Sequence, residues 1–209
     1  MKILKVTPMT ALAVLACLGT AQANIIGAAY FVPEAQAQNA VIGFPHGAPN
    51  ATFNVPNGPI DFNSIPTGAY TLGAFLATSP GVTGITGSPA DLARNLDIPG
   101  SGTMIELMGQ VSVVNGQTFT VTHDDGLQLM IGALLVVNVP GPTAPVTTTV
   151  TYTGPTGNFN FDLVYGECCG APARLQTSLP LQGVPEPGTL ALLGPALIGF
   201  GVARRRRRS

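Results

Sequence analysis

Apolar and polar residues alternate over short stretches in the middle of the chain, and this alternation predicts β-strands. Residues 104–113, 117–123 and 158–165 each place aliphatic or aromatic side chains at nearly every second position. Because successive side chains of a strand point to opposite faces, each segment is expected to bury one face in a core. Further strands are predicted at residues 51–55, 60–63, 127–131, 134–139 and 147–153.

Two turn sequences predict how some of these strands pair. Asn115-Gly116 is a strong signal for a two-residue hairpin, because both residues accept the left-handed backbone that such a turn needs. Gly154-Pro155-Thr156-Gly157 is a second turn signal. Each is expected to join the strands before and after it in an antiparallel hairpin.

One short helix is predicted among the strands. Ser88 can cap its first turn, Pro89 suits the first helical position, and Asp91 completes a capping box. The helix is expected to continue to Leu96.

Composition supports an all-β fold. The chain has 26 glycines and 19 prolines, and only 9% of its residues are charged, which suits an extracellular domain with many turns. Frequent branched aliphatic residues and phenylalanines argue against disorder. We therefore predict an antiparallel, jelly-roll-like β-sandwich, flanked by an N-terminal signal peptide and a C-terminal hydrophobic helix.

The N-terminus reads as a secretory signal. Two lysines precede an apolar core at residues 11–18, and Ala21 and Ala23 form an A-x-A cleavage site, so that the mature chain would begin at Asn24. Cys17 offers a lipoprotein alternative, but the residues before it fit a lipidation box less well than Ala21 and Ala23 fit a cleavage site.

The C-terminus combines a short motif, an apolar stretch and a basic end. Pro185, Glu186 and Pro187 form a stiff linker. Residues 190–203 would span about 21 Å as a helix at about 1.5 Å per residue, whereas a bilayer core is about 30 Å thick. Such a helix anchors a protein in the inner membrane only transiently. The stop-transfer residues that follow are Arg204, Arg205, Arg206, Arg207 and Arg208.

This order of features resembles the PEP-CTERM sorting tail of Gram-negative bacterial surface proteins. The resemblance implies recognition and removal of the tail by exosortase, a membrane protease, and a place in the exopolysaccharide or biofilm matrix. An ordinary C-terminal anchor is the alternative. The predicted organisation is a signal peptide at residues 1–23, a secreted domain at residues 24–183 and a sorting tail at residues 184–209.

The net charge becomes strongly negative when the predicted signal peptide and sorting tail are left out. The whole chain has a net charge of −1, but between Asn24 and Gly183 two arginines oppose nine carboxylates, which leaves −7. Such a surface does not attract nucleic acid or anionic lipid, whereas it can attract divalent cations.

The densest chemical signal is the pair Asp124-Asp125, followed by Gly126, between two predicted strands. With residues 164–175, which contain Glu167, it resembles the protective-antigen-type β-sandwich of bacterial toxins, glycosidases and flocculin adhesins. In the lectin members the paired aspartates, joined by a cis peptide, bind calcium, and the ion also holds sugar hydroxyls. The resemblance implies Asp124 and Asp125 as Ca²⁺ ligands, with Glu167 as a third candidate.

A pure turn is the alternative for this motif. Aspartate side chains can cap backbone amides, and Gly126 would then take a positive φ. His123 shares the parity of the buried positions of its strand, so it is expected to be partly buried and hydrogen-bonded rather than a metal ligand.

Cys168 and Cys169 are the cysteines that remain after processing. Outside the cytoplasm they are expected to oxidise, and we favour a vicinal disulfide over pairing between chains or free thiols.

These observations predict a secreted, surface-sorted, non-enzymatic matrix protein with calcium-assisted binding of extracellular polysaccharide. The alternative is a structural matrix protein without a small ligand. A glycosidase would need two carboxylates about 5 to 10 Å apart, and the acidic residues are too sparse to nominate a pair. Some ice-binding proteins carry the same tail, but we find no regular Thr-x-Thr ladder for an ice face.

Overall fold

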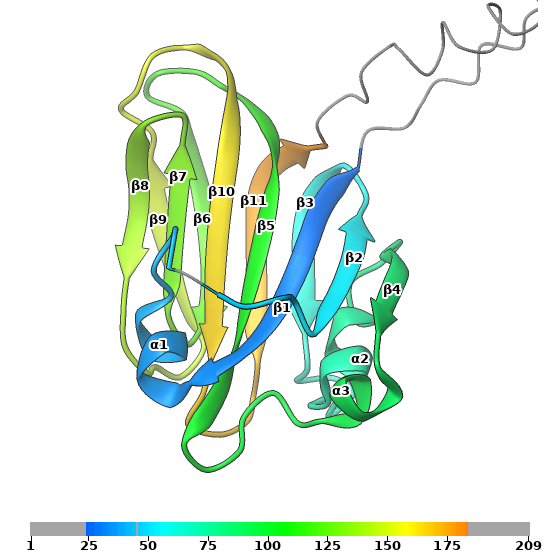
Figure 1. Cartoon of the computed structure of the whole chain (residues 1–209). Coiled ribbons are helices and arrows are strands. Elements are labelled where there is room, and N and C mark those ends of the chain that lie inside the picture. The colour runs from blue at the N-terminus through cyan, green and yellow to red at the C-terminus, as the bar shows by residue number, and fades with distance from the viewer. Residues whose placement is uncertain (1–23, 45, 184–209) are drawn as a thin grey trace, which may run out of the picture. The chain divides into compact units, whose positions relative to one another are not determined.

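Seven antiparallel strands form the first layer of the fold in a computed structural model that describes residues 24–44 and 46–183 (Figure 1). β1, β5 and β10 occupy its centre, and β4 and β8 form its edges. In spatial order the strands are β4 (Thr83–Gly87), β2 (Ala51–Val55), β1 (Ile25–Pro33), β5 (Ser101–Val113), β10 (Gly157–Glu167), β7 (Leu127–Ile131) and β8 (Leu134–Val139).

Four strands form the second layer. β11 (Arg174–Gln182) pairs on one side with β3 (Gly58–Asn63) and on the other with β6 (Thr118–Asp124), which in turn pairs with β9 (Val146–Thr151). The end of β11 also pairs with β5, so the two layers are hydrogen-bonded to each other at that point. Phe53 of β2 and Phe62 of β3 meet edge to face across the core, with ring centroids 6.0 Å apart. The predicted β-sandwich is confirmed.

The predicted burial pattern is confirmed in the central strands. Ile105 and Leu107 of β5 are buried in the core, as are Phe119 and Val121 of β6. Each buried aliphatic or aromatic side chain stabilises the fold by about 1.5–3 kcal/mol relative to an exposed one.

Both hairpin predictions are wrong, although the Asn115-Gly116 turn forms. Asn115-Gly116 carries the chain from β5 in the first layer to β6 in the second, and residues 152–156 carry it back from β9 to β10. The two crossings bind each other: the Asn115 side-chain amide donates to the carbonyl oxygens of Thr153 and Gly154 at 3.1 and 2.9 Å. These residues therefore stabilise the two connections between the layers. β5 does not pair with β6, and β9 does not pair with β10.

Threonines line the outer side of β6 and β9, contrary to our prediction that the chain has no regular Thr-x-Thr ladder. β6 and β9 place three pairs of threonines opposite one another, Thr118 with Thr151, Thr120 with Thr149, and Thr122 with Thr147. Five of these six threonines are exposed on the outer face, because Phe119, Val121 and Val150 between them face the core, and Thr122 is buried. A Thr-x-Thr ladder is thus present, which removes our reason for disfavouring the ice-binding alternative.

Three short helices complete the described residues: α1 (Glu34–Asn39), α2 (Leu72–Leu76) and α3 (Pro89–Ala93). The Ser88 side chain accepts a hydrogen bond from the Asp91 amide at 3.0 Å, as the capping box predicts. α3 ends three residues before the predicted Leu96, because the Leu96 amide instead donates to the carbonyl oxygen of Tyr70 at 3.0 Å.

α1 covers part of the outer face of the first layer near the end of β10 (Figure 1). Ala37 and Ala40 of this segment pack with Met104, Val164 and Cys168 in a small apolar cluster separate from the main core.

The predicted targeting segments lie outside the described residues, including the signal peptide, the hydrophobic helix at residues 190–203 and the arginine cluster. Within the described residues, each helix is too short or too polar to span a bilayer.

Candidate functional site

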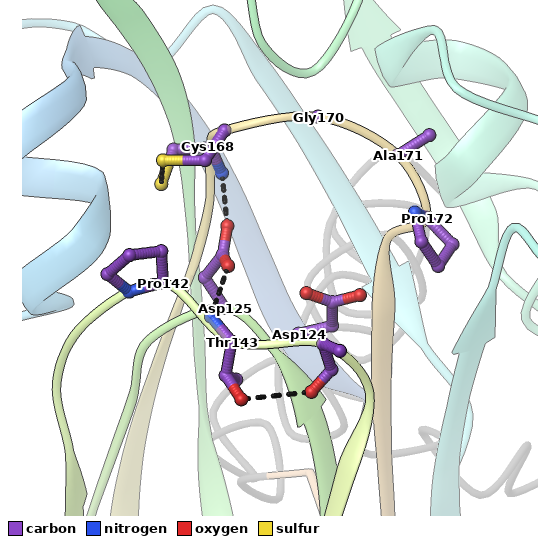
Figure 2. Close-up of a pocket in the computed structure, with 10 residues that line it drawn as sticks. Asp124, Asp125, Pro142, Thr143, Cys168, Gly170, Ala171 and Pro172 are labelled. Carbon is purple, nitrogen blue, oxygen red and sulfur yellow. Dashed lines mark hydrogen bonds between the residues drawn. The ribbon is translucent and has the colours of Figure 1, made fainter.

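One end of the sandwich holds a pocket of about 370 Å³ (Figure 2). Three loops form it: the segment after β6, the segment between β8 and β9, and the segment between β10 and β11. Its lining residues are Asp124, Asp125, Pro142, Thr143, Ala144, Cys168, Cys169, Gly170, Ala171 and Pro172. Both predicted aspartates therefore lie in the wall of one pocket.

Asp125 connects the three loops. Its Oδ1 accepts a hydrogen bond from the Thr143 amide at 2.8 Å, and its Oδ2 accepts one from the Cys168 amide at 2.8 Å (Figure 2). Its side chain is 3% exposed. Hydrogen bonds from amides to a carboxylate are among the stronger ones in proteins, so Asp125 fixes the loops relative to one another.

Asp124 behaves differently from its neighbour. It is also 3% exposed, but its buried Oδ2 has no hydrogen-bond partner among the described residues, and Figure 2 shows its carboxyl group apart from the bonds that hold Asp125. Burial, with the negative charge of Asp125 adding to it, raises the pKa of Asp124 to about 7. The peptide bond between the two aspartates is cis, as the resemblance implied. The pocket therefore contains a carboxyl group that still lacks a partner.

Glu167 does not line this pocket. It is fully buried, with Oε1 2.9 Å from the Tyr70 hydroxyl and Oε2 2.5 Å from the Tyr165 hydroxyl. Tyr165 also contacts the carbonyl oxygen of Asp124 and accepts a hydrogen bond from the Arg174 amide at 3.2 Å.

Burial decides the protonation state of Glu167. The hydroxyls of Tyr165 and Tyr70 donate hydrogen bonds to its carboxyl oxygens, and such bonds favour the charged form. Burial raises the pKa of Glu167 to about 10, and its hydrogen bonds to Tyr165 and Tyr70 offset only part of that rise. Glu167 is thus neutral at pH 7, and it is linked to the pocket through Tyr165, which contacts the backbone of Asp124.

His123 is buried, and its Nδ1 is hydrogen-bonded with the carbonyl oxygen of Asp125. Because a carbonyl only accepts, Nδ1 carries the proton. The prediction of a buried, hydrogen-bonded histidine is confirmed.

Gly126 has a different role from the one predicted. It does not adopt a positive φ. Instead, a Cβ built on it would lie 2.1 Å from the carbonyl oxygen of Gln38 in α1. The same oxygen accepts a hydrogen bond from the Gly141 amide at 2.7 Å. Glycine is required here because the backbone of α1 passes directly over the site.

The two cysteines are free thiols, with Sγ atoms 2.6 Å apart. Together with a carboxylate oxygen of Asp125 they form a group whose ligand atoms lie within 4.8 Å of one another. The vicinal disulfide stays a prediction.

The sequence reasoning missed the partners that complete the site. Thr143 follows Pro140-Gly141-Pro142, whose turn residues indicate a loop, but nothing in that loop pointed to Asp125. Tyr165 lies in the segment 158–165, which was predicted only as a strand with one buried face. Tyr70 stands about a hundred positions from its partner Glu167.

A second titratable group lies outside the pocket, on β10. Asp162 has a buried Oδ1 without a hydrogen-bond partner, and burial, with the charge of Glu106 adding to it, raises the pKa of Asp162 to about 6. A carboxyl group whose pKa is raised on folding binds its proton more tightly in the folded state. Its contribution to stability therefore falls as pH rises from about 4 to about 6 and is constant above that range.

We expect Asp162→Asn to remove this slope and to raise the melting temperature at pH 8 by a few degrees, because asparagine carries no charge to desolvate. Thermal melts of the variant and the wild type between pH 4 and pH 8 measure the difference. The exposed Asp61→Asn is the matched control. Parallel pH profiles of Asp162→Asn and wild type would contradict this account.

Comparison with known protein families agrees with the sorting signal. Residues 183–208 match the family model described as the PEP-CTERM protein-sorting motif. Similar solved structures include the PA14 domain of the MpAFP antifreeze protein (19% identity, 75% of this chain and 79% of that chain, TM-score 0.47) and the PA14 sugar-binding domain of an RTX adhesin (19% identity, 75% and 88%, TM-score 0.47). A GH31 α-xylosidase from Xanthomonas citri also matches (12% identity, 81% and 16%, TM-score 0.43). No curated protein sequence matches the chain.

The chain thus has a β-sandwich body and carries a PEP-CTERM sorting motif. That motif indicates a bacterial protein that is secreted and sorted to the surface or the extracellular space. It is the recognition signal of exosortase, a membrane protease, which makes exosortase a partner of this protein.

Proposed function

We propose that this secreted protein is a non-enzymatic, calcium-assisted glycan-binding module of the exopolysaccharide matrix of a Gram-negative bacterium. The observation that carries the proposal is the carboxyl group of Asp124. It is buried without a hydrogen-bond partner beside a second carboxylate, in a domain that has two arginines and no lysine between residues 24 and 183. Two adjacent ionised carboxylates repel each other unless a cation or hydrogen-bond donors compensate them, and among the described residues the buried Oδ2 of Asp124 has no donor.

The donor set suits Ca²⁺. Calcium prefers six to eight oxygen ligands, and the pocket offers two carboxylates, each of whose oxygens has two lone pairs. Asp125 uses one lone pair on each oxygen for the amides of Thr143 and Cys168, which orients the remaining pairs. The calcium ion would supply a positive charge that holds sugar hydroxyls. Glu167 is not included in this ligand set, because it is neutral and bonded to two tyrosines.

The surroundings of the carboxylates favour a polyhydroxy ligand. Pro142 and Pro172 present apolar surface on either side of the aspartates, while Thr143 contributes a hydroxyl. Sites for small ligands commonly combine apolar walls with a few fixed polar groups. A sugar has apolar C–H faces and hydroxyls in the same molecule.

A structural matrix protein without a small ligand is the second candidate. The observation that favours it is the full satisfaction of Asp125 by two backbone amides, which a pure loop-fixing role would also produce. In that case the pocket end would serve only to hold three loops together.

Glycan-array binding with calcium and with a chelator separates the two candidates. We expect the full chain to bind one class of polysaccharide in calcium and to lose that binding in chelator. We expect the Asp124→Asn, Asp125→Asn double variant to lose it as well. Polysaccharide binding that is the same with calcium and with chelator, or no binding at all by folded protein in calcium, would favour the structural candidate.

A further inference from the structure

Cys168 and Cys169 form a pair whose sulfur atoms already touch. The Sγ atoms lie 2.6 Å apart at the end of β10. Cys168 is 1% exposed and belongs to the apolar cluster under α1, whereas Cys169 is exposed. One thiol is therefore accessible to reagents and the other is held against it from inside the protein.

The pair is connected to the carboxylates of the pocket. The backbone amide of Cys168 donates to Oδ2 of Asp125 at 2.8 Å, and both cysteines line the pocket with Asp124 (Figure 2). A change in the backbone at residues 168–169 consequently changes the hydrogen bond that orients Asp125.

The backbone at Cys169 needs a restraint. Its φ is 67°, in the left-handed region that residues other than glycine rarely adopt, and Gly170, with a φ of 112°, follows it. In the thiol form, the restraints on the side chain are weak contacts with α1. Gln38 Nε2 donates to Sγ at 3.4 Å, and the thiol donates to Oε1 of Glu34 at 3.6 Å. A covalent bond between the two sulfurs would restrain the same backbone far more strongly.

From this geometry we propose that Cys168 and Cys169 are a reversible dithiol–disulfide pair that controls the calcium affinity of the Asp124–Asp125 pocket. The inference rests on the proposed function of that pocket. Closing the ring fixes the torsion angles between the two Cα atoms and so restrains the Cα of Cys168, to which the amide that binds Asp125 is attached. The disulfide form is the tighter calcium binder, because less conformational freedom remains to be lost on binding.

The chemistry requires an oxidant, which is a small-molecule or protein disulfide. The exposed Cys169 thiol loses its proton and attacks one sulfur of that disulfide, which forms a mixed disulfide and releases a first thiol. The Cys168 thiol then loses its proton and attacks the Cys169 sulfur, which releases a second thiol. Two electrons and two protons pass to the oxidant, and one sulfur–sulfur bond replaces another.

The test compares calcium binding by the full chain after treatment with oxidised glutathione and after treatment with dithiothreitol. Peptide mapping by mass spectrometry identifies the Cys168–Cys169 bond, and calorimetry gives the calcium Kd in each state. We expect a Kd about threefold to tenfold lower in the oxidised state, reversed by reductant. The control is the Cys168→Ala, Cys169→Ala double variant, which keeps both backbone amides and Cys17 and should bind calcium equally in both treatments.

The possible outcomes distinguish a failure of the redox switch from a failure of the calcium site. Equal affinity of the oxidised and reduced wild type overturns the switch and leaves calcium binding intact, as does oxidation that links separate chains in place of the two neighbours. No calcium binding in either state, by protein that melts cooperatively, overturns the proposed function and the switch with it. A redox-dependent Kd that persists in the double alanine variant assigns the effect to Cys17 and overturns the role of the pair.

Discussion

We expect the replacement of Asp124 and Asp125 together by asparagine to abolish the rise in melting temperature that the proposed calcium site should give the wild-type chain. An ion that binds only the folded state stabilises it by RT ln(1 + [L]/Kd), which is about 2.7 kcal/mol at a hundredfold excess over Kd. For a domain of this size that corresponds to a rise of about 5–10 °C. Asparagine keeps the shape of each side chain but removes the charge that attracts the ion, so the double variant is expected to melt at the same temperature with calcium and with chelator.

The same variant separates a lost site from a lost fold. Without calcium, it should still melt cooperatively but somewhat below the wild type, because an asparagine in place of Asp125 can accept a hydrogen bond from only one of the two amides of Thr143 and Cys168. Removal of the charge of Asp124 and of its repulsion by Asp125 offsets part of that loss. Glu167→Gln is the matched control: Glu167 is neutral and bonded to Tyr70 and Tyr165, so the amide should leave the calcium response within about twofold of wild type. A wild-type melt that is independent of calcium would contradict the calcium site.

The local signals in the sequence were reliable where the structure is decided locally. Alternation located the strands, and Ser88 and Asp91 located the start of α3. The Asn115-Gly116 turn also forms, with Gly116 at a φ of 82°. What the turn could not reveal was the partner strand, since β5 already has β1 and β10 as neighbours and β6 finds its partners in the other layer. Strand pairing of this kind depends on long-range burial, which short turn motifs do not encode.

The candidate site, too, has a part that the sequence predicted and a part that it did not. The aspartate pair and its place at a strand end were readable from the sequence, because the motif is contiguous. The roles of Gly126 and Glu167 were not, because each depends on a segment far away in the chain. Gly126 is a glycine because of Gln38, and Glu167 is neutral because the fold buries it, although the hydrogen bond from the distant Tyr70 favours its charged form.

Close approach of α1 makes Gly166→Ala the most disruptive small substitution that we expect near the site. A Cβ on Gly166 would lie 1.7 Å from the carbonyl oxygen of Ala37, far inside van der Waals contact. The backbone of Gly166 fixes the position of the Cβ, and the oxygen belongs to the backbone of Ala37, so no side-chain rotation can relieve the clash. Ala37 is fully buried, and α1 would have to move off β10. We expect a loss of about 3 kcal/mol or more, seen as a melting temperature about 6–12 °C lower.

The matched control is Gly47→Ala, the same substitution at a position with no atom within 4 Å of the new Cβ and no left-handed φ, which should change stability by no more than about 0.5 kcal/mol. Gly166→Ala should also weaken calcium binding, because the Asp125 amide donates to the Gly166 carbonyl oxygen at 3.1 Å and the Gly166 amide donates to that of Gly126 at 2.8 Å. Displacing β10 there moves the strand end that carries the Cys168 amide, and with it the orientation of Asp125. If Gly166→Ala melts within about 2 °C of Gly47→Ala, α1 does not press on the site, and the account of why these positions are glycine is wrong.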